Sequence, residues 1–119
     1  METCSDTFEI TICAAEKICE IDADIIRSSN QTNRVCRARI AVFLVLYQRG
    51  WTAQRISEFF KSYTRENLNV STVTHGLCRA RKLRKIDPSF AYLCDQIKEE
   101  VIAIRSANNT VAIGLRYSR

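Results

Sequence analysis

The feature that most constrains the fold is an almost continuous apolar helix near the middle of the chain. Residues 34–49 read RVCRARIAVFLVLYQR, and apolar side chains lie on nearly every side of the predicted helix from residue 35 to residue 47. A surface helix shows a single apolar stripe, so a helix that is apolar all round is expected at the centre of a domain. Gly50 follows, and glycine is the residue that most often ends a helix.

The rest of the chain predicts further helices packed around this central one. Apolar residues recur at helical spacing in most of it, and polar residues that favour N-caps precede several of these segments. The expected helical segments are residues 6–19, a short turn at 21–26, and residues 34–49, 53–62, 69–85 and 88–105. The expected N-caps are Asp6, Asp22, Thr52, Asn69 or Ser71, and Asp87. The sequence therefore predicts an all-α fold, a compact bundle of about five helices.

The end of the chain shows a different pattern. Asn108 and Asn109 are expected to break the last helix, and beyond them Val111, Ile113 and Leu115 alternate with other residues, as in a strand. A single strand has no ladder partner inside a helical domain. We therefore divide the chain into one domain, residues 1–109, and a tail, residues 110–119. The tail is expected to form a short strand with a second copy, to dock on the bundle, or to stay loose.

Charge is distributed unevenly along the chain. Residues 1–33 carry seven acidic and two basic residues, a net charge of −5, whereas residues 34–85 carry twelve basic and two acidic residues, a net charge of +10. The remaining residues carry four of each. A basic middle segment between acidic and neutral ones indicates a polyanionic partner. A solvated charged face is the simpler alternative.

Several function classes lack support in the sequence. The six cysteines form no CxxC pair and match no zinc spacing, so we expect buried free thiols in a reducing compartment, cytoplasmic or nucleoid-associated. The start of the chain does not resemble a signal peptide, and the longest apolar run is too short to span a bilayer. No catalytic dyad, phosphate-binding glycine motif or metal site is recognisable. We therefore expect no enzyme, no cofactor, no metal and no small-molecule substrate.

Residues 71–85 carry the clearest functional pattern. Short hydroxyl side chains and a histidine come first, and five basic residues follow within positions 79–85. On a helix, one side is expected to pack through Val70, Val73, Leu77 and Ala80, and the other to present Ser71, Thr72, His75, Arg79 and Lys82. Such a helix suits the major groove of DNA, with its first turn at the bases and its last turn at the phosphates. With the preceding helix it would form a helix-turn-helix over about residues 52–85.

At these residues the chain resembles a known family, the C-terminal DNA-binding domain of the bacterial replication initiator DnaA, within the Trp-repressor-like superfamily. The family has an Ile-Ala-x-Tyr-Leu helix before the helix-turn-helix, a recognition helix that opens with His-Ser/Thr-Thr-Val, and a closing Arg-Lys-Ile. The matching segments here are residues 40–44 (IAVFL), Ile56, residues 71–75 (STVTH) and residues 81–83 (RKL). The resemblance covers roughly residues 8–104 and implies double-stranded DNA as the partner, in regulation or replication.

The chain departs from the family at the turn. Residues 61–68 are about five residues longer than the family's short glycine-rich turn, and Asn69 and Val70 replace its Asp-His pair. The family's target sequence is therefore not carried over. Its ATPase module is absent from this chain as well.

The resemblance and the helical stripe together give the candidate contacts. The candidates for base contact are Asn69, Ser71 and Thr72. By position, the resemblance implies that arginines near the start of the central helix grip the DNA backbone or reach the minor groove, and that Thr52 presents a helix N-terminus to a phosphate. The backbone or minor-groove candidates are Arg34, Arg37, Arg39, Thr52, His75, Arg79, Lys82 and Lys85. If six to eight phosphates are neutralised, the log–log salt slope of binding should be about −5 to −7.

Two other interpretations remain open. The same fold could serve as a non-catalytic adaptor or inhibitor, with the acidic first third and the apolar tail as its working surfaces. A basic helix alone also does not distinguish DNA from RNA. A homodimer is also compatible with DNA binding, because one such helix reads few base pairs and the tail offers an edge.

Overall fold

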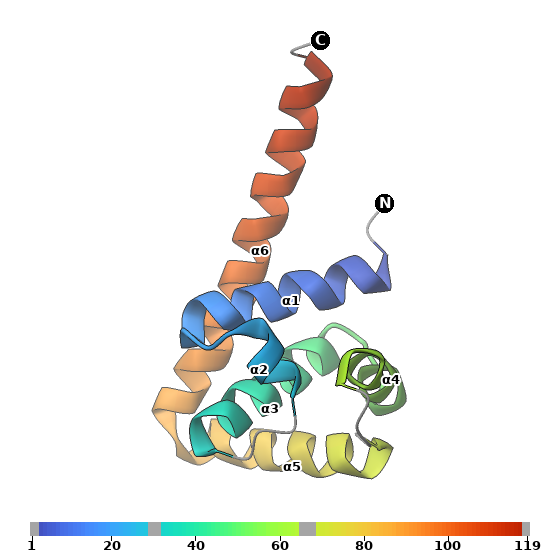
Figure 1. Cartoon of the computed structure of the whole chain (residues 1–119). Coiled ribbons are helices and arrows are strands. Elements are labelled where there is room, and N and C mark those ends of the chain that lie inside the picture. The colour runs from blue at the N-terminus through green and yellow to red at the C-terminus, as the bar shows by residue number, and fades with distance from the viewer. Residues whose placement is uncertain (1–2, 29–31, 65–68, 118–119) are drawn as a thin grey trace.

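Six helices account for most of the chain that the computed structural model describes (Figure 1). It describes the backbone of residues 3–28, 32–64 and 69–117, and the side chains of these ranges apart from residues 62–64 and 108–117. The helices are α1 (Cys4–Cys19), α2 (Ala23–Arg27), α3 (Asn33–Gln48), α4 (Ala53–Thr64), α5 (Val70–Ile86) and α6 (Pro88–Tyr117). The predicted all-α fold is confirmed.

Helix α3 is the central helix, as its apolar sequence predicted. Every residue from 38 to 46 is buried, and α3 touches all five other described helices. The predicted end of α3 before Gly50 is also confirmed, because Gly50 adopts the left-handed conformation that favours glycine, with a φ of +96°. The elements that carry the candidate site, α4 and α5, thus pack against a helix that is buried from residue 38 to residue 46.

Most of the helices begin at the N-cap residue that the sequence predicts, but the N-cap of α1 lies earlier than predicted. Asp22, Thr52 and Asn69 each accept a hydrogen bond from a backbone N–H in the first turn of the following helix. The exception is α1, where Thr3 is the N-cap and Asp6 is the third helical residue of a capping box. The prediction of Asp6 as the N-cap was therefore wrong by three residues, because the Asp6 carboxylate accepts the backbone N–H of Thr3 while the Thr3 hydroxyl accepts that of Asp6.

An aromatic cluster joins the N-terminal helix to the central and fourth helices. Phe8 lies 5.2 Å from Phe60 between ring centroids, and Phe60 in turn meets Phe43 edge-on at 5.1 Å. Trp51, at the turn before α4, lies 5.0 Å from Phe59. Offset and edge-on aromatic pairs stabilise beyond the area they bury. This cluster holds α4 against the rest of the bundle, and α4 in turn contacts α5.

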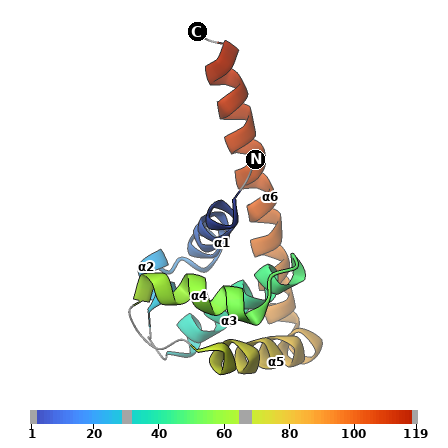
Figure 2. The ribbon, with the colours of Figure 1, turned by 90° about the vertical axis from the view of Figure 1, so that its right-hand side faces the viewer.

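The predicted strand at the end of the chain is wrong, because α6 continues as a helix to Tyr117. Figures 1 and 2 show this end of α6 extending beyond the other helices. Adding residues to an existing helix avoids the cost of nucleation, and each asparagine lowers helix stability by well under about 1 kcal/mol. Asn108 and Asn109 therefore do not end the helix, and the alternating pattern had no strand partner to pair with.

The start of α6 carries a charged contact that should affect stability at low pH. The Asp87 carboxylate accepts hydrogen bonds from the Ser89 hydroxyl at 2.7 Å and from the Arg37 guanidinium at 3.0 Å. These bonds favour the ionised form and lower the pKa of Asp87 from 3.8 to about 2. Because the pKa is lower in the folded state, the stabilisation is present above pH 4 and is lost as the pH falls toward 2.

We therefore expect the urea midpoint of the native chain to fall more steeply between pH 4 and pH 2 than that of Asp87→Asn. Asparagine can still cap the helix but does not titrate in this range. Urea unfolding at a series of pH values measures the difference. Parallel pH profiles for the two proteins would contradict the expectation.

Candidate nucleic-acid interface

Helix α5 separates a buried side from an exposed side. Val73, Leu77 and Ala80 are at most 4% exposed and pack into the core, as predicted. Val70, which was expected on the same stripe, is instead 42% exposed, since it lies in the first turn at the edge of the bundle. The exposed side carries Ser71, Thr72, His75, Arg79, Lys82 and Lys85. Apart from Val70, α5 therefore has the buried side and the exposed side that the sequence predicts.

The first turn of α5 is ordered by Asn69. The Asn69 amide oxygen accepts a hydrogen bond from the backbone N–H of Thr72 at 2.9 Å and from its hydroxyl at 3.1 Å. The amide nitrogen of Asn69 is not used in this cap, and the residue is exposed. Ser71 lies beside it, also exposed. The three base-contact candidates thus form one exposed group of hydrogen-bonding side chains.

The second half of α5 supplies unneutralised positive charge. The helix contains no acidic residue, and Arg79, Lys82 and Lys85 make no ion pair with any side chain that the structure describes. Arg84 differs from them, because it binds Asp95 of α6 at 2.9 Å and its pKa is raised by that hydrogen bond. Three exposed cations on one helix attract an anionic partner.

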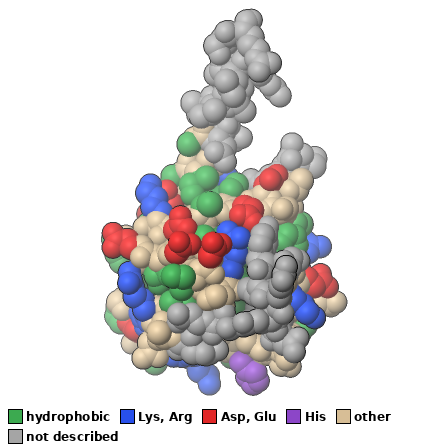
Figure 3. All heavy atoms as spheres, viewed as in Figure 1, with side chains coloured by type: hydrophobic (Ala, Val, Ile, Leu, Met, Phe, Trp, Pro, Cys, Tyr) green, Lys and Arg blue, Asp and Glu red, His purple; other side chains and the backbone are tan. Residues whose placement is uncertain are grey.

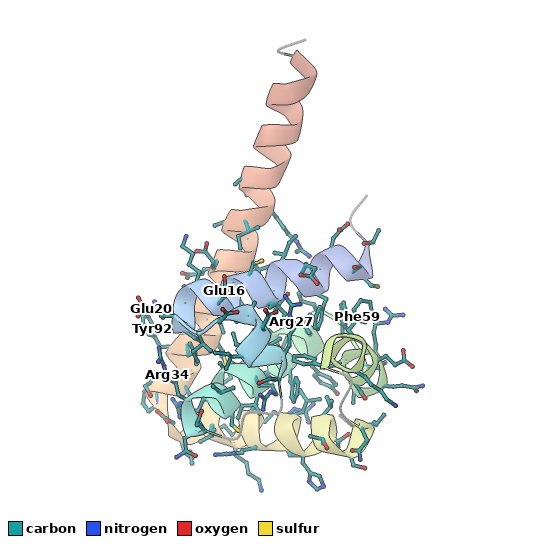
Figure 4. The ribbon with its side chains drawn as sticks, in the orientation of Figure 1. Glu16, Glu20, Arg27, Arg34, Phe59 and Tyr92 are labelled. Atoms are coloured by element: carbon teal, nitrogen blue, oxygen red, sulfur yellow. The ribbon has the colours of Figure 1, made fainter. Side chains whose placement is uncertain are left out.

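The acidic residues gather elsewhere. Figure 3 shows several red side chains over α1 and α2, with blue ones among them, while the histidine and a basic side chain lie at the lower edge, where Figure 1 places α5. Glu16 of α1 and Glu20, the C-cap of α1, lie on this side of the molecule, away from α5 (Figure 4). On this face, acidic side chains are therefore concentrated near α1 and α2, and α5 carries none.

Arg39 does not belong to the interface. It is 7% exposed, and its guanidinium donates to the main-chain oxygens of Ile26 and Ser28 at the end of α2. Burial lowers the pKa of Arg39. The prediction of a DNA contact is corrected here, because this side chain satisfies carbonyl groups that a helix end leaves unpaired.

Arg34 and Arg37 also serve helix ends. Arg34 donates to the carbonyl oxygen of Cys19 at 2.7 Å, at the end of α1, and Figure 4 shows it on that side of the molecule. Arg37 binds Asp87 at 3.0 Å, beside the start of α6, with its guanidinium carbon 5.3 Å from the centre of the Phe90 ring. All three arginines of the first turns of α3 are therefore engaged at helix ends, and Arg37 binds the residue that caps the C-terminus of α5.

Thr52 and His75 are placed differently from each other. Thr52 is exposed, but its hydroxyl accepts the backbone N–H of Arg55 at 3.1 Å and so caps α4. His75 is exposed on α5, one turn after Ser71. The structure therefore brings His75 into the exposed group, whereas Thr52 serves as the N-cap of α4.

Sequence reasoning missed two exposed residues on α5. Cys78 is exposed rather than buried, as are Cys4 and Cys13, contrary to the expectation of buried thiols. Arg81 lies over the ring of Tyr47, with its guanidinium carbon 4.7 Å from the ring centre. Helical spacing alone could have placed Cys78 beside His75, whereas the contact between Arg81 and α3 depends on how the helices pack.

Comparisons of the chain with protein-family models, with curated proteins and with solved structures found no match. Within the described residues, no group of histidine, cysteine and acidic side chains could hold a metal ion. None of the described helices is both long and apolar enough to cross a membrane.

Proposed function

We propose that this protein binds double-stranded DNA by placing α5 in the major groove. The observation that carries the proposal is the exposed side of α5, with hydrogen-bonding side chains in its first turns and, in its last turns, cations that make no ion pair with a described side chain. Recognition helices contact base edges near their N-termini and phosphates further along. The proposed base contacts are Asn69, Ser71 and Thr72, and the proposed phosphate contacts are His75, Arg79, Lys82 and Lys85.

The relation between α4 and α5 supports a helix-turn-helix. Helix α4 is seen nearly end-on in Figure 1 and from the side in Figure 2, while α5 runs across Figure 1. The two helices therefore cross steeply and are in contact. In helix-turn-helix proteins the first helix crosses the DNA backbone while the second enters the groove. A DnaA-like domain, with a regulatory or replication-associated role, is the family that we propose on this basis.

The salt dependence of binding tests the proposal directly. With Arg34, Arg37 and Arg39 engaged at helix ends, the three proposed cations Arg79, Lys82 and Lys85 of α5 remain, so the log–log slope should be about −2.7 instead of −5 to −7. The affinity for a duplex should fall about 40-fold between 50 mM and 200 mM salt. Fluorescence anisotropy with a labelled duplex measures this, and an affinity that does not change with salt would rule out the proposal. Competition with duplex RNA separates the two nucleic acids.

A second candidate function is favoured by α6. Its end leaves the bundle (Figures 1 and 2), and isolated helical segments this short are marginally stable in water without packing. An adaptor or inhibitor that binds another protein, or a second copy of this chain, would use such an extension. Pull-down of a protein partner that is indifferent to nuclease treatment would favour this function, and sedimentation analysis would test the homodimer.

A further inference from the structure

Arg81 lies on the opposite flank of α5 from Arg79. Residues two apart on an α-helix point about 160° apart. When the side that carries Ser71, His75 and Lys82 faces a groove, Arg79 and Arg81 are therefore directed toward its two walls. In the major groove, those walls are the phosphate backbones of the two strands.

The Arg81 side chain is restrained by an aromatic ring of another helix. Its guanidinium carbon lies 4.7 Å from the centre of the Tyr47 ring, in the last turn of α3. Tyr47 is 40% exposed, and Arg81 is exposed as well. Among the described side chains, Arg81 makes no ion pair. A guanidinium held over a ring face keeps N–H donors at its edge available to another partner.

We propose that Arg81, positioned by Tyr47, binds a backbone phosphate on the strand opposite the one that Arg79 contacts. This inference rests on the proposed binding of α5 to duplex DNA. Guanidinium groups bind phosphates through two parallel hydrogen bonds, which require a defined orientation. The ring supplies that orientation in advance, so less side-chain freedom is lost on binding. Tyr47 is then a positioning residue. The C-terminal end of α3 thereby contributes to the DNA-binding surface.

Three single substitutions separate charge from positioning. Arg81→Ala should lower duplex affinity about tenfold and reduce the salt slope by about 0.9, because one phosphate contact is lost. Tyr47→Leu should lower affinity about threefold and leave the slope unchanged, because the charge stays while its restraint is lost. Tyr47→Phe keeps the ring and should bind within about twofold of the native chain. Urea midpoints establish that each variant is folded.

The double variant tests whether the two residues act together. If Tyr47 acts through Arg81, Tyr47→Leu should have no further effect on affinity in the Arg81→Ala background. Lys17→Ala is the control. Lys17 is an exposed cation of α1 that pairs with Glu100 of α6 at 2.9 Å, outside the proposed helix-turn-helix. Its removal should leave the salt slope as it is.

The outcomes separate this inference from the proposed function. If the native chain shows no salt-dependent duplex binding, the proposed function fails. If it binds but Arg81→Ala keeps the native slope, Arg81 contacts no phosphate and only the inference is overturned. It is likewise overturned if Tyr47→Leu weakens binding equally with and without Arg81, because the ring then only supports the fold.

Discussion

Replacing Arg79, Lys82 and Lys85 together by glutamine is expected to lower duplex affinity at least about 100-fold near 0.1 M salt and to reduce the salt slope by about 2.7. These three cations are exposed and make no ion pair with the described side chains, so their charge is available to DNA phosphates. Glutamine keeps a long side chain with good helix propensity. The fold should therefore survive, and anisotropy titrations at several salt concentrations measure the loss.

A matched variant separates local charge from total charge. Lys17, Lys98 and Arg105 lie on α1 and α6, outside the proposed helix-turn-helix, and changing them to glutamine removes the same number of positive charges, three, from a net charge of +5. Lys17 pairs with Glu100 at 2.9 Å, but its side chain is 69% exposed, and pairs of this kind stabilise little. The control variant should keep most of the affinity. Equal losses in the two variants would mean that α5 is not the binding surface.

The central helix and most helix starts could be predicted because their causes are local. A segment that is apolar on every side can only be buried, whatever surrounds it, and α3 is buried from residue 38 to residue 46. Caps such as Asp22 and Asn69 depend on the residues that follow within one turn. The exposed and buried sides of α5 likewise follow from helical spacing.

The contacts of individual arginines could not be predicted, because they depend on which helix ends lie nearby in the folded chain. Arg39 and Arg79 look alike in the sequence, yet Arg39 satisfies carbonyl groups at the end of α2 while Arg79 is exposed on α5. Nothing within one turn of Arg39 reveals that α2 ends beside it. The same reasoning explains why the restraint of Arg81 by Tyr47 was missed. Basic clusters in a sequence therefore overstate the number of cations available to a polyanion.

The end of the chain was misjudged for a different reason. Alternating apolar residues predict a strand only where another strand can pair with it. The sequence from Val111 to Leu115 follows a helix that is already formed, so continued helical hydrogen bonding costs less than starting a new element. The helix that precedes these residues therefore determined their conformation more strongly than their alternating apolar pattern did.

Replacing Gly76 by alanine is expected to destabilise the fold by about 1–3 kcal/mol, although alanine normally stabilises a helix interior relative to glycine by about 1 kcal/mol. A Cβ at this position would lie 2.8 Å from Cδ2 of Phe43 and 3.2 Å from Cγ2 of Ile40. Phe43 is 1% exposed and is held edge-on by Phe60, so its ring cannot move aside easily. Gly76→Leu is expected to prevent folding. Urea unfolding measures both effects.

Two controls distinguish this close approach from helix propensity. Cys78→Ala, on the exposed side of α5, should be neutral or slightly stabilising. In a Phe43→Leu background, which makes room beside α3, Gly76→Ala should become neutral or stabilising. If Gly76→Ala stabilised the native chain, α5 would not lie this close to α3. The depth at which α5 docks decides which of its side chains reach the surface, so that result would also remove the geometric basis for placing Ser71 and Arg79 against DNA.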